Sequence, residues 1–281
     1  MTLPRRIVVK VGTSTLTDEE GKLDRAFIAD LTSQLATLRR EGADVILVSS
    51  GAIRAGLEAL GNPTLGAKRE PDSQDLAADT LPYKQAAAAI GQGLLQRLYT
   101  EAFAWRKTIC AQVLLTRDDL GDPNRLENAK NTLCALLQLS VIPVINENDT
   151  VAVEEIKFGD NDTLAARVAV LISADLLLIL SDVEGLYDRS PLQHSGTLED
   201  APRLIHRVEN IALVTGLGGN SMSGVGTGGM KTKLEAARIA TEAGIRTVIA
   251  KGHRERVALD VAHGEKIGTE FPPTRESGVR D

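Results

Sequence analysis

The chain has 281 residues, of which 43% are hydrophobic and 25% charged, and its formal net charge at pH 7 is −6. This composition is typical of a globular protein with a full hydrophobic core. The acidic balance gives no overall positive field for nucleic acid, and no apolar run approaches the roughly 20 residues that a membrane helix needs. We therefore expect no binding to nucleic acid and no membrane insertion.

The first residues enter an apolar strand pattern directly, without the apolar core of a secretory signal peptide. Two cysteines, Cys110 and Cys134, stand apart in apolar segments, which favours small buried thiols over a disulfide framework. These two features together predict a cytoplasmic protein.

Apolar runs of strand length alternate with helical spacing of apolar residues along the chain. The elements expected in the first half are, in order, strand 5–11, helix 24–40, strand 43–49, a short helix ending at 60, helix 82–105 and strand 108–116. Those expected in the second half are helix 124–139, strand 141–145, helix 163–173, strand 175–180, helix 231–243 and strand 245–250. Residues 61–81 contain prolines and mixed charges and predict a long mobile loop.

Strands that are apolar throughout, and that alternate with helices, are typical of a parallel sheet covered on both faces. We therefore predict an α/β fold, a three-layer α/β/α sandwich with a mainly parallel central sheet. We found no internal repeat and no linker that would split the core. The expected organisation is one domain over residues 1–272, followed by a polar tail at 273–281.

A glycine-rich loop over residues 216–233 leads directly into the expected helix at Lys231. Glycines let main-chain N–H groups approach a ligand, and a helix start adds free N–H groups and the positive end of its dipole. Lys231 and Lys233 contribute positive charge, so the loop predicts a polyphosphate site. A flexible surface loop is the alternative.

Two known phosphate-binding patterns almost fit this loop. Gly224, Gly226 and Gly229 match the dinucleotide fingerprint, but the strand that should precede them and the acidic residue that should follow are absent. The P-loop pattern starting at Gly224 fails by one residue, because Met230 stands between Gly229 and Lys231. We therefore expect a phosphate site of another kind, and a Rossmann dehydrogenase is the weakest alternative.

Polar groups follow the ends of the expected strands, where ligands bind in open α/β sheets. They are Lys10 and Gly12 after the first strand, Ser50 and Gly51 after the second, Asn146, Asp149, Asn161 and Asp162 after the fourth, and Ser181 and Asp182 after the fifth. Lys10 interrupts an apolar strand, so its ammonium must either reach solvent or meet an anion. The pattern predicts a ligand site at this edge of the sheet.

Other chemistries are less compatible with the sequence. Val48 replaces the first glycine of a serine-hydrolase elbow around Ser50, and no histidine completes a recognisable triad. The acidic residues at 149–162 lack the spacing of a calcium loop, and zinc-ligand spacing is absent.

Five segments, in this order along the chain, closely resemble the glutamate 5-kinase family of amino acid kinases. They are Lys-Val-Gly-Thr-Ser (10–14), Ser-Ser-Gly-Ala-Ile (49–53), Pro-Val-Ile-Asn-Glu-Asn-Asp (143–149), Lys-Phe-Gly-Asp-Asn-Asp (157–162) and Gly-Thr-Gly-Gly-Met-Lys-Thr-Lys (226–233). The third and fourth segments together distinguish this family from its siblings that act on acetylglutamate, aspartate, carbamate or uridylate. The resemblance implies the amino acid kinase fold and ATP-dependent phosphorylation of the γ-carboxylate of L-glutamate, the first step of proline biosynthesis.

The resemblance also implies a role for each matching residue. The implied catalytic residues are Lys10, Lys233 and Asp162, with Asp162 orienting the lysines. The implied glutamate-binding residues are Ser50, Gly51, Asn146, Asp149 and Asn161, with Asp149 pairing the α-ammonium group. The implied nucleotide-binding residues are Lys10, Gly12, Ser181, Asp182, Thr227, Gly228, Gly229, Met230, Lys231, Thr232 and Lys233.

The implied cofactors are ATP and Mg²⁺, with the metal held mainly by phosphates and water and by no protein cage. The implied partners are L-glutamate, a glutamyl-phosphate reductase that receives the product, and further copies of the chain in a homo-oligomer. The sequence departs from many family members in lacking a C-terminal domain of a type met in RNA-modifying enzymes, and its 61–81 loop is longer. The alternatives are a sibling amino acid kinase and a non-catalytic nucleotide or amino-acid sensor.

Overall fold

The computed structural model describes residues 3–61, 80–151, 161–189, 201–214, 216 and 229–274. Within them, seven strands form one sheet in the order β3-β4-β2-β1-β5-β6-β7. The strands are β1 (Arg6–Val11), β2 (Asp44–Ser49), β3 (Cys110–Leu115), β4 (Ile142–Glu147), β5 (Leu176–Ser181), β6 (Arg246–Lys251) and β7 (Thr269–Phe271). All neighbouring strands pair in parallel except β7, which runs antiparallel to β6. The predicted mainly parallel α/β fold is confirmed.

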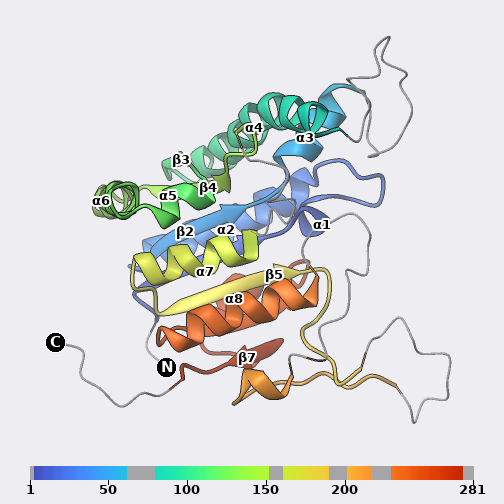
Figure 1. The fold of residues 1–281 in the computed structure, drawn as a ribbon, viewed down its shortest axis with the longest axis vertical. Helices are drawn as coiled ribbons and strands as arrows, with labels where there is room; N and C mark the ends of the chain where they lie inside the picture. Colours follow the sequence, from blue (N-terminus) through green and yellow to red (C-terminus); the bar gives the residue numbers. More distant parts are fainter. Residues whose placement is uncertain are drawn as a thin grey trace.

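Helices cover both faces of this sheet (Figure 1). They are α1 (Thr13–Leu16), α2 (Arg25–Arg40), α3 (Ala52–Ala59), α4 (Leu81–Ala104), α5 (Arg117–Gly121), α6 (Pro123–Gln138), α7 (Asn161–Leu171), α8 (Met230–Glu242) and α9 (Val257–Ala262), with a 3₁₀ turn, η5 (Ile211–Leu213). None of the helices in the described ranges is both long and apolar enough to cross a membrane.

Side chains that alternate along the strands divide the core into two halves. Ile7, Val9 and Val11 of β1 pack in one apolar cluster with α2, α4 and α9. Val8 of the same strand packs in a second cluster with α6, α7 and α8. A strand that buries both faces is mostly apolar, which explains why β1 is an apolar run that only Lys10 interrupts after Arg6.

Local signals in the sequence set the ends of the longer helices. The Asp24 side chain accepts a hydrogen bond from the Phe27 N–H at the start of α2, and Asp122 caps α6 immediately before Pro123. After α2, Gly42 adopts a positive φ of 100°, a conformation that favours glycine. The two aspartates thus set where α2 and α6 begin, and Gly42 forms the turn between α2 and β2.

Several predicted boundaries and elements are wrong in detail. Asn146 lies inside β4, which extends to Glu147, and α7 begins at Asn161 instead of residue 163. The sequence did not predict α1, α5, α9 or β7, because three to six residues are too short for a periodic pattern. Cys110 and Cys134 are free thiols, as expected, but both are only half-buried. Residues 62–79 of the predicted mobile loop lie outside the described residues.

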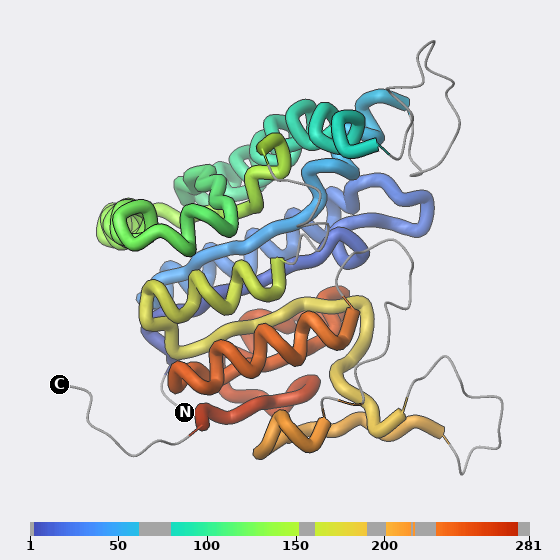
Figure 2. Tube along the Cα trace, in the orientation of Figure 1, coloured from blue at the N-terminus to red at the C-terminus, as the bar shows by residue number. Residues whose placement is uncertain are grey.

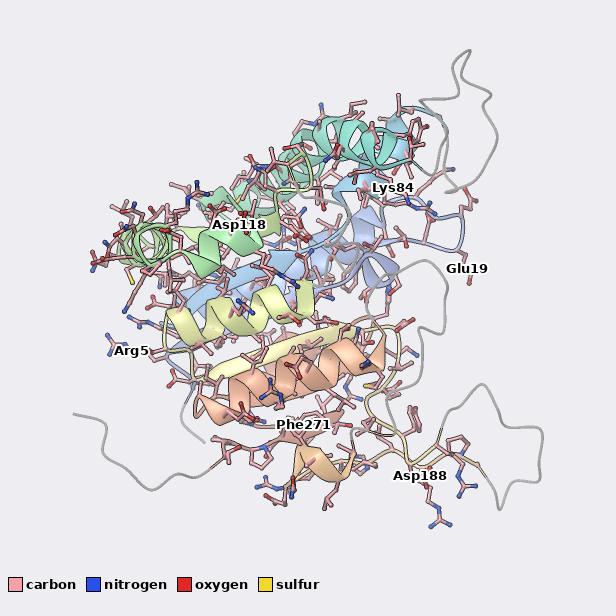
Figure 3. All side chains as sticks on the ribbon, in the orientation of Figure 1. Arg5, Glu19, Lys84, Asp118, Asp188 and Phe271 are labelled. Carbon is pink, nitrogen blue, oxygen red and sulfur yellow. The ribbon has the colours of Figure 1, made fainter. Side chains whose placement is uncertain are left out.

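The carboxyl ends of the central strands lie at the right of Figure 1, where α1 and α3 begin. The tube in Figure 2 shows β5 beside β1, although β5 follows β1 far along the chain. In Figure 3, Glu19 and Lys84 lie toward this edge of the molecule, and Arg5, just before β1, lies at the opposite end. The residues that follow β1, β2, β4 and β5 are thus gathered at one edge.

Candidate active site

At this edge, a buried carboxylate is flanked by two lysines. Lys10 of β1 places its Nζ 2.5 Å from Asp162 Oδ1, and Lys233 of α8 places its Nζ 3.2 Å from Asp162 Oδ2. The exposed fractions of Lys10, Asp162 and Lys233 are 4%, 0% and 6%. Three charged side chains from three elements that are all far apart in sequence therefore meet away from solvent.

The two ammonium groups keep Asp162 ionised. Burial by itself raises the pKa of this carboxyl, but the charges of Lys10 and Lys233 and the hydrogen bonds from Lys10 and Thr232 outweigh burial and hold the pKa well below its ordinary value. The Thr232 hydroxyl lies 2.8 Å from Asp162 Oδ2 and also 2.9 Å from the Gly229 carbonyl oxygen. With two lysines and one carboxylate, the group retains a formal charge of about +1 for an anionic ligand.

Two glycines shape the backbone beside these charges. A Cβ added to Gly12 would lie 3.1 Å from Lys10 Nζ, so the absence of a side chain lets the ammonium lie close to the main chain. Gly51 has a positive φ of 104° and starts α3 directly after Ser50. Both glycines thus follow the strand ends at which the sequence predicted a ligand.

A network of amides and hydroxyls lies on the β2–β4 side of Lys10. Asn161 Nδ2 donates to Ser50 Oγ at 2.7 Å and to Asn146 Oδ1 at 3.0 Å. Asn146 Nδ2 donates to Gln92 Oε1 at 2.8 Å. Asn161 Oδ1 is buried and has no hydrogen-bond partner among the described residues, so within them it is an unsatisfied acceptor. Sequence reasoning predicted Ser50, Asn146 and Asn161 but missed Gln92, which lies in an alanine-rich helix outside any motif.

Asp149 follows β4 and differs electrostatically from Asp162. Burial, with a smaller contribution from the charge of Glu147, raises the pKa of Asp149 to about 7. No basic side chain in the described part of the chain forms a salt bridge with it. Asp149 is therefore a desolvated carboxyl that a cationic ligand group would stabilise in its charged form.

Apart from Lys10 on β1 and Gly12 just after it, the described residues that were predicted to bind a nucleotide lie on the β5 side of β1. Ser181 ends β5 and is buried, and its hydroxyl donates to Asp182 Oδ1 at 3.1 Å. Gly229 is the N-cap of α8 and makes no side-chain cap to the N–H groups of the first turn, Met230–Thr232, which lie at the positive end of the helix dipole. Thr227 and Gly228 lie outside the described residues.

The charged side chains give no sign of a protein metal cage. No group of three histidine, cysteine or acidic residues within the described ranges is placed to hold a metal ion. Both oxygens of Asp162 are engaged by lysines. Asp162 is therefore already paired with two cations, which leaves it unsuited to bind a metal ion directly.

Comparisons with known proteins identify relatives of this chain. A sequence model of the amino acid kinase family matches residues 5–251. The glutamate 5-kinase of Geobacter sp. (strain M21) is 46% identical over 275 residues, which cover 97% of this chain and 69% of the relative. The glutamate 5-kinase of Caldanaerobacter subterraneus subsp. tengcongensis is 50% identical over 271 residues, which cover 96% of this chain and 68% of the relative.

A solved structure supports the fold alone. The UMP kinase from Bacillus anthracis superposes with a TM-score of 0.60 and 13% sequence identity, covering 97% of this chain and 98% of the other. At this identity the similarity concerns the three-layer architecture and not the substrate.

Proposed function

Because the chain belongs to the amino acid kinase family and, within it, to the glutamate 5-kinases, we propose that it transfers the γ-phosphoryl group of ATP to the γ-carboxylate of L-glutamate. The product is L-glutamyl 5-phosphate, and the reaction is the first step of proline biosynthesis. The resemblance of the five sequence segments to this family is confirmed. The observation that carries the proposal is the pair of lysines on Asp162, beside an amide network whose acceptor Asn161 Oδ1 is satisfied by no described residue.

The reaction needs positive charge and alignment more than it needs a base. The γ-carboxylate of glutamate is ionised at pH 7, so no side chain has to remove a proton from the nucleophile. Phosphoryl transfer depends mainly on in-line positioning and on charge that stabilises the phosphoryl oxygens. Lys10 and Lys233 supply that charge, and Asp162 sets their positions without touching the substrate.

The acceptor binds on the β2–β4 side. The position of glutamate is lined by Ser50, Gly51, Asn146 and Asn161. Asn161 Oδ1 provides a hydrogen-bond acceptor for a donor group of the bound glutamate. Asp149 pairs with the α-ammonium group, which explains why its carboxyl is desolvated without a protein cation beside it.

The nucleotide binds on the β5 side. Gly12, Ser181, Asp182 and the segment 227–233 contact ATP, with Lys233 and the first N–H groups of α8 at its phosphates. Mg²⁺, held by the phosphates and water, neutralises charge on the β- and γ-phosphate oxygens. Lys10 lies on the strand between the two sides, where the transferred group passes.

The chemistry of the product suggests its next partner. An acyl phosphate hydrolyses readily, so we propose that it is handed to a glutamyl-phosphate reductase. We also propose that the enzyme works as a homo-oligomer, as its family generally does, and in the cytoplasm, where ATP and glutamate are abundant.

An assay with hydroxylamine tests the proposed reaction. The protein is incubated with ATP, Mg²⁺, hydroxylamine and one acceptor, and hydroxamate is measured by its colour with iron. We expect hydroxamate with L-glutamate and little with N-acetylglutamate or aspartate. Turnover with a different acceptor would assign the chain to a sibling kinase, and nucleotide binding without any turnover would indicate a sensor.

A further inference from the structure

Gln92 reaches the acceptor side of the site from a helix that carries none of the predicted site residues. It lies on α4, and its Oε1 accepts the hydrogen bond from Asn146 Nδ2 at 2.8 Å. Asn146 is only 2% exposed, so its amide has no access to water as an alternative partner. Gln92 is therefore the acceptor for a buried donor next to the proposed glutamate position.

A close crossing of two helices brings Gln92 to this position. A Cβ added to Gly91 would lie 1.9 Å from the Ala52 carbonyl oxygen, and one added to Gly56 would lie 1.8 Å from the Ala87 carbonyl oxygen. The backbones of α3 and α4 therefore touch where Gly91 and Gly56 lack side chains. Since α3 begins directly after Ser50 and Gly51, the contact fixes Gln92 relative to the end of β2.

Backbone groups fix the orientation of the amides in this network. Asn146 Oδ1 accepts from the Glu147 N–H at 2.8 Å, so Asn146 Nδ2 must point the other way, toward Gln92. Asn161 Nδ2 also lies 3.4 Å from the Ser49 carbonyl oxygen, which identifies it as the nitrogen and not the oxygen of that amide. The amides of Asn146 and Asn161 can thus each face only one way.

The orientation of Asn161 decides what the site offers to a substrate. Its Nδ2 is used by Ser50 and Asn146, and its Oδ1 is the buried acceptor that no described residue satisfies. A rotation of the Asn146 amide by half a turn would set its NH₂ group against the Glu147 N–H and against Asn161 Nδ2. That rotation would place donors against donors and would displace Asn161.

We propose that Gln92 is a positioning residue for the acceptor substrate, acting through Asn146 to hold Asn161 Oδ1 and the Ser50 hydroxyl toward it. This inference rests on the proposed function. It extends that function by adding α4 to the elements that determine acceptor binding. Gln92 lies on the side of β1 opposite to the predicted nucleotide residues. Its effect therefore falls on glutamate and not on ATP.

Steady-state kinetics of three variants test this role. Gln92→Met has a similar length but no acceptor oxygen, and Gln92→Glu keeps an acceptor for Asn146 Nδ2. Gln96→Met is the matched control, since Gln96 lies one turn further along α4 and contacts Thr100 and Cys110 instead of the site. Thermal unfolding and the KM for ATP establish that each variant is folded, and Gln92→Ala replaces Gln92→Met if that variant does not fold.

We expect Gln92→Met to raise the KM for glutamate roughly tenfold, because a buried donor loses its partner, and to leave the KM for ATP and kcat within about twofold. Gln92→Glu should recover most of the affinity, and Gln96→Met should match the wild type. A KM for glutamate unchanged in Gln92→Met, or raised equally in Gln96→Met, would overturn the role of Gln92 while leaving the kinase intact. Absence of glutamate-dependent turnover in the wild type would instead overturn the proposed function, and this inference with it.

Discussion

Asp162 determines the electrostatics of the site at the scale of single residues. A fully buried carboxylate is unfavourable unless charges compensate it, and here two ammonium groups do so from opposite oxygens. The same carboxylate keeps two lysines close together that would otherwise repel each other. We infer that the lysines are held ready before ATP binds, so little rearrangement is needed when the phosphoryl group is transferred.

Lys10→Ala tests the role of charge at the phosphoryl group. We expect kcat to fall at least about 100-fold, because a donor that stabilises transition-state charge is lost, while glutamate affinity stays within about threefold. Turnover is measured by hydroxamate formation and glutamate binding by calorimetry. Lys130→Ala, an exposed change on α6, serves as the control. A Lys10→Ala enzyme with normal kcat would rule out the mechanism.

Asp149 predicts a dependence of glutamate binding on pH. Its carboxyl has a pKa raised to about 7 in the unliganded protein, and only its ionised form can pair with an ammonium group. The apparent affinity for glutamate should therefore be lost as pH falls through about 7, by up to roughly tenfold per pH unit. The KM for glutamate measured between pH 5.5 and pH 8.5 tests this expectation.

The matched variant for this titration is Asp149→Asn. It should bind glutamate weakly and with little dependence on pH over the same range, because the asparagine side chain does not ionise there. The assignment of the titration to Asp149 fails if the variant keeps the pH profile of the wild type.

At the scale of helices and strands, the longest apolar segments were predictable and the shortest were not. Apolar runs identified β1, β2, β4 and β5, because burial on both faces leaves few polar positions, and those lie toward the carboxyl ends of the strands at the site. The antiparallel β7 has only three residues and no such signal. The short helix α5 depends on a capping box between Thr116 and Asp119, which a periodicity search does not detect.

The site residues, too, divide into those that the sequence predicted and those that depend on tertiary packing. Lys10, Ser50, Asn146, Asn161 and Asp162 were found because each lies at a strand end or helix start within a distinctive segment. Gln92 was not found, since only the tertiary crossing of α3 and α4 places it there. The shared contact of Lys233 and Thr232 with Asp162 likewise depends on packing of α8 beside α7, which no local pattern encodes.

The crossing of α3 and α4 gives a prediction for stability. Gly91→Ala should lower the free energy of unfolding by about 1–3 kcal/mol and raise the KM for glutamate, because the added methyl group would overlap the Ala52 carbonyl oxygen and shift α4. Gly93→Ala is the matched control on the same helix. A Cβ there meets nothing within 4 Å, so this variant should gain up to about 1 kcal/mol from helix propensity.

Urea unfolding of both variants tests that expectation. If Gly91→Ala were as stable as Gly93→Ala, the two helices would not be in the close contact described, and the position of Gln92 would lose its explanation.

At the scale of the whole molecule, strand order separates the two substrates. β2 and β4 lie on one side of β1, whereas β5 and β6 lie on the other. Successive strands are thus added first to one side of β1 and then to the other, so the strand order reverses beside β1. Open α/β sheets bind ligands at such a reversal, outside the carboxyl ends of the strands. The residues proposed to bind the acceptor therefore come mainly from one half of the sheet and those proposed to bind the nucleotide mainly from the other, with Lys10 between them.

The central claim is that Lys10 and Lys233 act on the same transferred phosphoryl group. A crystal structure of the protein with L-glutamate, Mg²⁺ and a non-hydrolysable ATP analogue tests it most directly. We predict both Nζ atoms at about 3 Å from oxygens of the terminal phosphate, with the γ-carboxylate of glutamate in line with it on the Asn161 side. A terminal phosphate that contacts only one of the two lysines, or a glutamate bound away from Asn161, would contradict the account.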